Sequence, residues 1–234
     1  MRAGILLDDP ELRLELVRLT DWHTDDLFAW LVHHGASLFV NGTSRLVIDP
    51  ERFDDPVREP AEASGQGVVY TRTTDGRPLR NEDPLSRERL IARFYRPYHA
   101  ALDALTGELL SAFDRCTLLD CHSFPTEPLP SDLDRAPDRP DICIGRDPEH
   151  TPVALAERLA AAFRAEGFSV AFDRPYSGSM VPSAFHGRDR RLRSIMIEVR
   201  RGLYIDEASG ERSSGYAALR SALERAVVAS GALE

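Results

Sequence analysis

Lysine is absent from this chain of 234 residues, so the 29 residues counted as lysine plus arginine are all arginine. A guanidinium group stays protonated and forms no Schiff base, which excludes chemistry through a lysine nucleophile. Cysteine is also scarce: Cys116, Cys121 and Cys143 are an odd number without zinc-finger spacing. This pattern favours a reduced, cytoplasmic protein over a disulfide-linked secreted domain.

Long hydrophobic runs are missing as well. No stretch of about 18 apolar residues occurs, so we expect no membrane span. The start, "MRAGILLDDPELRL", lacks the basic-then-apolar layout of a signal peptide. The net charge of −9 argues against a nucleic-acid partner, because phosphate binding needs a basic face. Length and ordinary composition together predict a single domain over residues 1–234.

Short apolar runs of strand type alternate with segments of helical periodicity along most of the chain. This alternation predicts an α/β fold, in which a mixed, mostly parallel sheet is flanked by helices. Helices are expected over 152–167, closed by Gly167, and over 215–230. The expected strands are 37–40, 44–50, 116–120, 142–145, 168–173 and 194–199.

Two regions depart from this alternation. Residues 53–88 are rich in Pro, Gly, Asp and Glu, which predicts an irregular insertion with a hairpin around Asp75 and Gly76. Residues 85–113 have helical periodicity, and we expect that helix to be kinked or broken before Pro97.

The strand that ends in "TLLDCHSFP" carries the first chemical signal. Side chains alternate along a strand, so Asp120 and His122 should point to the same side. Open α/β sheets place their active-site crevice at the carboxyl ends of strands. The segment therefore predicts either a capped strand end or a metal-binding histidine with a carboxylate beside it.

The segment "DWHTDDLF" supplies Asp21, His23, Asp25 and Asp26 at an expected helix start. Acidic residues are favoured in a first helical turn, and Asp21 or Thr24 can act as the N-cap. The spacing of three between His23 and Asp26 also suits two metal ligands on one helix face. Capping and metal binding both stay open for this segment.

Arginines of the segment "NGTSRLVIDPER" form a second group of candidates. Arg45 and Arg52 suit bidentate binding of a substrate carboxylate, and structural pairing with Asp49 is the alternative. Tyr98 and His99 follow the helix-breaking Pro97, where they can line a pocket or simply pack.

Glu198 is a carboxylate inside the apolar run "SIMIEV". Burying it without a partner is expensive. It is therefore expected either on a solvent-facing edge strand or in a cleft, where a raised pKa suits a general base.

Taken in order, the motifs resemble those of N-formylglutamate amidohydrolases. The resemblance spans about residues 20–207 and is carried by "TDWHTDDLF", "TSRLVIDPER", "YRPYHAAL", "LLDCHS", "PDICIG", "YSGS" and "IMIEVRRGLYIDE". It implies a fold similar to that of the zinc carboxypeptidases (phosphorylase/hydrolase-like), with Zn²⁺ at the carboxyl ends of strands. It also implies hydrolysis of the amide of a small acidic N-acyl amino acid such as N-formylglutamate.

The same resemblance implies roles for individual residues. Glu198 would be the general base, and the metal ligands would be His122 with Asp25 or, as second choice, Asp21. Asp120, Asp49 and Gly178 would support the site. Substrate binding would fall to Arg45, Arg52, Tyr98, His99 and Ser123.

One departure from the family pattern concerns the start of the chain. The family begins with a strand that ends in Pro-His-Ser-Gly, whose His is an expected metal ligand, and this chain starts at "MRAGILLDD". We therefore expect an under-liganded site with reduced zinc affinity. The alternative function is that of a catalytically inactive protein that binds carboxylates on the same fold.

Overall fold

The computed structural model describes residues 4–81 and 83–234, which fall into two compact units. The described part of the first unit comprises residues 4–20, 41–81, 83–102 and 129–132, and the second unit comprises residues 21–40, 103–128 and 133–234. The single domain over residues 1–234 stays a prediction.

The second unit is built on a four-stranded sheet in the order β1-β4-β2-β3. Its strands are β1 (Cys116–Phe124), β2 (Ile142–Gly145), β3 (Val170–Phe172) and β4 (Leu192–Arg200). β1 pairs with β4 and β2 with β3 in parallel, whereas β2 and β4 are antiparallel. The α/β fold with a mixed, mostly parallel sheet is therefore confirmed.

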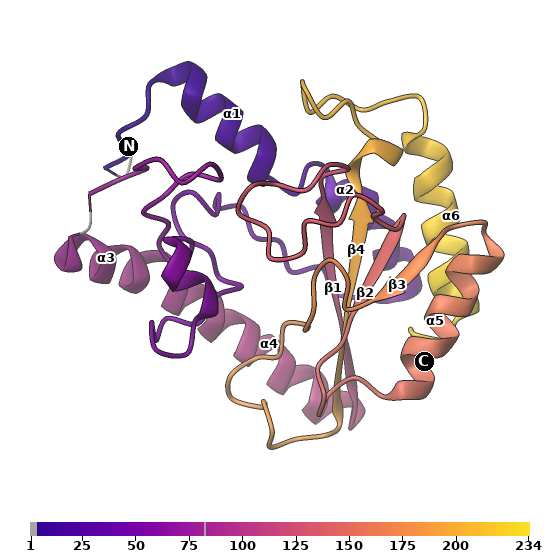
Figure 1. Cartoon of the computed structure of the whole chain (residues 1–234). Helices are drawn as coiled ribbons and strands as arrows, with labels where there is room; N and C mark the ends of the chain where they lie inside the picture. Colours follow the sequence, from indigo (N-terminus) through magenta and orange to yellow (C-terminus); the bar gives the residue numbers. More distant parts are fainter. Residues whose placement is uncertain (1–3, 82) are drawn as a thin grey trace. The chain divides into compact units, whose positions relative to one another are not determined.

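Two long helices, α5 (Val153–Ala165) and α6 (Tyr216–Ala229), pack together beside this sheet (Figure 1). Their apolar faces share one core with α2 (Thr24–Leu27), the 3-10 helix η1 (Ala29–His34) and the strands. β4 lies between two neighbours, which explains why its burial is nearly continuous rather than alternating. A short 3-10 helix, η4 (Arg201–Leu203), follows β4 directly.

The first unit consists mainly of helices and turns. It holds α1 (Asp9–Leu19), the 3-10 helix η2 (Pro60–Ser64), α3 (Pro84–Leu90), a π-helical turn η3 (Ile91–Tyr95) and the start of α4 (Arg96–Phe113). The expected break before Pro97 takes the form of η3, because Pro97 has no N–H to donate to the preceding turn. Glu82 of the expected insertion lies outside the described residues.

Several expectations about elements are corrected by the structure. Residues 37–40 form no strand, and their apolar side chains are exposed. Residues 44–50 are turns, because the carbonyl and hydroxyl of Ser44 accept the N–H groups of residues 46–48, which competes with strand pairing. β1 continues past Asp120 to Phe124 and ends only before Pro125.

Other expectations hold. The turn around Asp75 and Gly76 is present, with an antiparallel bridge between Arg72 and Pro78 and a positive φ of 82° at Gly76. No helix within residues 4–81 and 83–234 is both long and apolar enough to cross a membrane.

Candidate active site

One face of the sheet is apolar and the other carries the polar side chains. Leu119 and Cys121 of β1 pack against the α5–α6 core, as do Ile195, Ile197 and Val199 of β4. Because side chains alternate along a strand, Asp120 and His122 of β1 and Glu198 of β4 point to the opposite face. That face therefore holds the expected chemistry of the second unit.

His122 has a carboxylate at each ring nitrogen. Its Nε2 lies 2.8 Å from Oδ1 of Asp120, and its Nδ1 lies 3.2 Å from Oδ2 of Asp21. The expected juxtaposition of Asp120 and His122 is thus confirmed. A neutral imidazole has one N–H and carboxylates only accept, so a further proton or a cation is required to satisfy both contacts.

Asp21 reaches His122 because the chain before α2 is fixed at several points. The Thr24 hydroxyl donates to the Asp21 carbonyl at 3.1 Å, and the buried Tyr204 hydroxyl donates to the Trp22 carbonyl at 2.8 Å. His23 adopts a left-handed backbone conformation (φ 59°), with Nε2 2.9 Å from the Gly210 carbonyl. His23 is therefore held as a structural residue of this turn.

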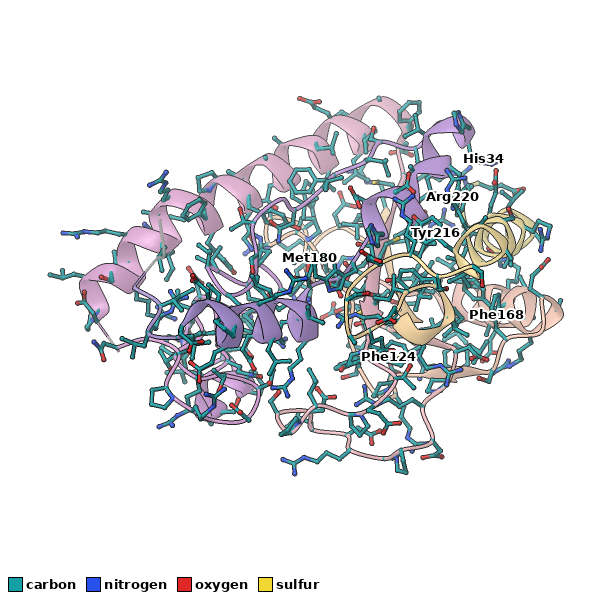
Figure 2. The ribbon with its side chains drawn as sticks, turned by 90° about the horizontal axis from the view of Figure 1, so that it is seen from above. His34, Phe124, Phe168, Met180, Tyr216 and Arg220 are labelled. Carbon is teal, nitrogen blue, oxygen red and sulfur yellow. The ribbon has the colours of Figure 1, made fainter. Side chains whose placement is uncertain are left out.

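Asp25 was the preferred second ligand, and the structure places it differently. It lies in α2 with an exposed side chain, whereas Asp21 contacts His122. Its neighbour Asp26 faces α6, accepting a 2.7 Å bond from Tyr216 and pairing with Arg212 (Figure 2 labels Tyr216 and Arg220 on this helix). The geometry favours Asp21 over Asp25, because α2 begins only at Thr24 and turns its acidic residues elsewhere.

Glu198 lies on the central strand of the sheet and is 8% exposed, so it is no solvent-facing edge residue. Its Cα partner on β1 is His122, and its partner on β2 is Cys143. Adjacent strands run about 4.8 Å apart, so the backbones that carry Glu198 and His122 are immediate neighbours. Burial raises the pKa of Cys143 to about 12, which keeps that thiol protonated near neutral pH.

Asp120 is fixed by the loop before β4. Its Oδ2 accepts the Met180 N–H at 2.8 Å, which leaves Oδ1 for His122 (Figure 2 labels Met180). This loop lies close to β2, because a Cβ added to Gly145 would stand 2.2 Å from the Gly178 carbonyl. Gly178 itself has a positive φ of 88°. Gly178, expected as a supporting residue, thus lies where the backbone of this loop comes close to that of β2, beside Asp120.

Three contacts of this face involve Arg201, a residue that the motifs did not single out. The Arg201 guanidinium is buried, donating from Nε to the Ser123 hydroxyl at 3.1 Å and from one terminal nitrogen to the Ser123 carbonyl at 2.9 Å. The same terminal nitrogen lies 3.2 Å from Oδ1 of Asp21. Its sequence signal is an arginine directly after an apolar strand, next to a second arginine, and that signal does not reveal which of the two turns inward.

In the first unit, Asp49 is the centre of a separate charged cluster. Its carboxylate is 1% exposed, accepts the Tyr70 hydroxyl at 2.8 Å and lies 3.8 Å from Arg52. Burial opposes its ionisation, but the charges of Arg45 and Arg52 and the Tyr70 bond outweigh burial, so the pKa of Asp49 is lowered. Burial beside that carboxylate also raises the pKa of Tyr70 to about 12.

Tyr98 and His99 lie at the start of α4 in the same unit. Nε2 of His99 donates to the Pro50 carbonyl at 3.0 Å, and its ring packs against that of Tyr95 in a tilted arrangement, with the ring centroids 4.1 Å apart. The Tyr95 hydroxyl donates to the Arg52 carbonyl at 2.9 Å. These contacts tie the start of α4 to the segment that carries Asp49 and Arg52.

The donors on the polar face of the sheet suit a divalent cation. They are an imidazole and carboxylates, the ligand types found in catalytic zinc sites with nitrogen and oxygen donors. His122 lies between two carboxylates, Asp120 at Nε2 and Asp21 at Nδ1, and a cation at one ring nitrogen resolves the excess of acceptors around the ring. The residues present therefore fit the metal that the motifs imply.

Comparison with known proteins agrees with the geometry. The family profile described as N-formylglutamate amidohydrolase matches residues 2–205. The chain is 29% identical to an N-formylglutamate deformylase from Pseudomonas putida, over 80% of this chain and 71% of that one.

Solved structures give the same result. A crystal structure of N-formylglutamate amidohydrolase from Ralstonia eutropha JMP134 superposes with a TM-score of 0.81 at 25% identity, covering 99% of this chain and 87% of that one. A gene product from Agrobacterium tumefaciens, with a TM-score of 0.67 at 18% identity over 95% of this chain and 82% of that one, shares the fold. The chain belongs to the N-formylglutamate amidohydrolase family.

Proposed function

We propose that this protein is a zinc-dependent amidohydrolase that cleaves the amide of an N-formyl or N-acyl acidic amino acid, with N-formylglutamate as the leading substrate. The observation that carries the proposal is His122, which has a carboxylate at each ring nitrogen and Glu198 beside it on the next strand. Family membership and the relatives named as deformylase and amidohydrolase support the substrate class.

His122 and Asp120 would hold the metal, and Asp21, at the other ring nitrogen, would orient the imidazole. The chemistry that zinc supplies when bound is a water of pKa near about 7 and polarisation of the scissile carbonyl. The carboxylates fix the orientation of the His122 ring, since each contacts one nitrogen. Cys121 packs against the α5–α6 core, on the face of the sheet opposite to His122, and the Cys143 thiol donates to the Tyr176 carbonyl, so neither thiol is assigned to the metal.

Glu198 is the residue proposed to move the proton. Its carboxylate accepts a proton from the attacking water and returns that proton to the amide nitrogen as the carbon–nitrogen bond breaks. The products are formate, or the corresponding acid, and the free amino acid. Burial on a central strand and the register with His122 support this role, because the base must stand within one water of the reacting carbonyl.

Arg45 and Arg52 are proposed to bind the carboxylates of the substrate, together with Tyr98 and His99 of the same unit. The family motifs support this role, and a guanidinium binds a carboxylate through two parallel hydrogen bonds. Asp49 supports both arginines, since their charges act on its carboxylate.

The experiment is a substrate comparison on the purified chain with added zinc. Formate release from N-formylglutamate should exceed release from N-formylleucine, and a chelator should abolish both activities. A metal-loaded, folded protein that binds glutamate but releases no formate would replace this proposal with the carboxylate-binding alternative.

A further inference from the structure

Arg201 is a buried cation directly beyond the carboxyl end of β4. It is 4% exposed and opens η4, so its backbone leaves the sheet while its side chain turns back toward β1. The neighbouring Arg200 turns to Asp141, with which it forms an ion pair. Two consecutive arginines thus serve different partners.

Arg201 and Ser123 form a set of contacts, the Arg201 bracket, that holds one carboxylate oxygen of Asp21. One terminal nitrogen contacts both Oδ1 of Asp21, at 3.2 Å, and the Ser123 carbonyl, at 2.9 Å, while Nε donates to the Ser123 hydroxyl at 3.1 Å. Ser123 in turn donates its N–H, at 3.2 Å, and its hydroxyl, at 3.3 Å, to the same Oδ1. This leaves Oδ2 of Asp21 facing Nδ1 of His122.

These contacts are unlike those of a substrate-binding arginine. The guanidinium donates inward to Ser123 and Asp21, and its side chain is only 5% exposed. A buried ion pair is weak support for stability, since its desolvation offsets most of the attraction. The Arg201 bracket instead fixes the orientation of the Asp21 carboxylate, so that Oδ2 faces Nδ1 of His122.

We propose that Arg201 is a positioning residue of the active site, which orients His122 through Asp21 and Ser123. This inference rests on the proposed function for its catalytic consequence. Carboxylates that orient a metal-binding His change metal affinity by about 10- to 100-fold when they are disturbed. Losing the Arg201 bracket should therefore weaken zinc binding and lower kcat, with KM little changed, because the substrate does not touch the guanidinium.

The test compares Arg201→Lys and Arg201→Gln with the matched control Arg200→Gln. Zinc affinity is measured by chelator competition, kcat and KM by formate release, and folding by thermal unfolding. We expect both Arg201 variants to bind zinc about 10- to 100-fold more weakly, while the Arg200 variant keeps the wild-type affinity. A lysine cannot reproduce the three contacts, so Arg201→Lys should resemble Arg201→Gln.

A purely structural role gives a different pattern. The variants would then unfold at lower temperature, but their folded fraction would bind zinc as tightly as the wild type, which would overturn the proposal. Arg201→Gly with added guanidinium chloride is the second arm, because recovery of zinc affinity identifies the missing group as the guanidinium. Absence of recovery in a folded, zinc-binding Arg201→Gly protein would count against the bracket.

Failure of the proposed function is distinguishable from failure of this inference. If the wild type binds zinc without releasing formate, the amidohydrolase proposal fails and the affinity comparison still decides the role of Arg201. If the wild type binds no zinc, crystal structures decide it: an unchanged contact between Asp21 and His122 in Arg201→Lys overturns the inference, and a lost contact supports it.

Discussion

Each unit of the molecule holds a charged cluster, one around Asp49 and the other around His122. The two clusters differ in the balance between hydrogen-bond donors and acceptors. Asp49 in the first unit accepts the Tyr70 hydroxyl and the Glu51 N–H, and two arginine charges stabilise its ionised form. Asp21 and Asp120 in the second unit converge on one imidazole, which cannot donate to both when neutral.

The difference separates an aspartate whose acceptors meet donors within the fold from an imidazole that needs a further proton or a cation. Asp49 accepts from Tyr70 and from a backbone N–H, while Nε of Arg52 beside it has no hydrogen-bond partner among the described residues. His122 has acceptors on both sides and Glu198 beside it, an arrangement that is costly for folding alone and useful for holding a metal.

The largest effect is expected for Glu198→Gln. The amide cannot accept the proton of the attacking water, so kcat should fall by about 10²- to 10⁴-fold while zinc binding is retained. Cys143→Ala is the control, because it alters the neighbouring β2 position in the same register without removing a base. Equal loss of activity in both variants would show that disturbing the sheet, rather than removing a base, stops the reaction.

Arg45→Lys and Arg52→Lys test whether the cluster of the first unit also recognises the substrate. A point-charge ammonium does not reproduce the bidentate fork, so KM for N-formylglutamate should rise about tenfold or more. Arg77→Lys, at an exposed arginine paired with Asp75 and Glu11, should leave KM unchanged. Unchanged kinetics in both Arg45→Lys and Arg52→Lys would confine these arginines to a structural role.

Asp49→Ala tests how much the cluster around Asp49 contributes to the free energy of unfolding. Loss of the partner for the buried Tyr70 hydroxyl should cost about 2–3 kcal/mol in the free energy of unfolding. The folded pKa of Asp49 is lowered, so its contribution is present above the unfolded value of about 3.8 and lost as the pH falls through the folded value. Chemical unfolding at pH 7 and pH 3 should therefore show a smaller difference between variant and wild type at pH 3.

The smallest effect is expected at the α2–α6 contact. The Tyr216 bond is the main reason that the pKa of Asp26 is lowered, and the carboxylate is nearly half exposed. Asp26→Asn should cost only about 0.5–1 kcal/mol, because solvent screens exposed pairs. The cost should be present at pH 7 and be lost as the pH falls through the folded pKa of Asp26, which lies below the unfolded value of about 3.8. A loss of several kcal/mol would show that α2 depends on this contact.

The sequence predicted those parts of the fold that follow local periodicity. β2, β4, α5 and α6 match their expected segments, because alternating or continuous apolar runs and a terminal glycine are local signals. The runs at 37–40 and 44–50 misled, since a short apolar run does not show whether a neighbouring strand is available to pair with it. Ser44 shows the competing signal, a side chain that caps a turn.

For the candidate site, too, the sequence predicted what depends on local pattern and missed what depends on contacts between distant segments. Asp120 and His122 follow from the period of a strand, whereas the preference for Asp25 over Asp21 depended on an element boundary that only the structure gives. Arg201 lies 180 residues from Asp21 along the chain, so no local pattern could pair them. Contacts between such distant residues depend on how the strands and loops are arranged in the fold.

The central claim is that the polar face of the sheet binds the metal through His122. The most direct measurement is calorimetric zinc titration of the wild type, His122→Asn and the control His34→Asn, whose imidazole pairs with Glu224 on the helical side. We expect about one zinc ion per chain for the wild type and the His34 variant, and an affinity at least about 100-fold weaker for His122→Asn. Zinc binding of equal tightness in all three proteins would contradict it.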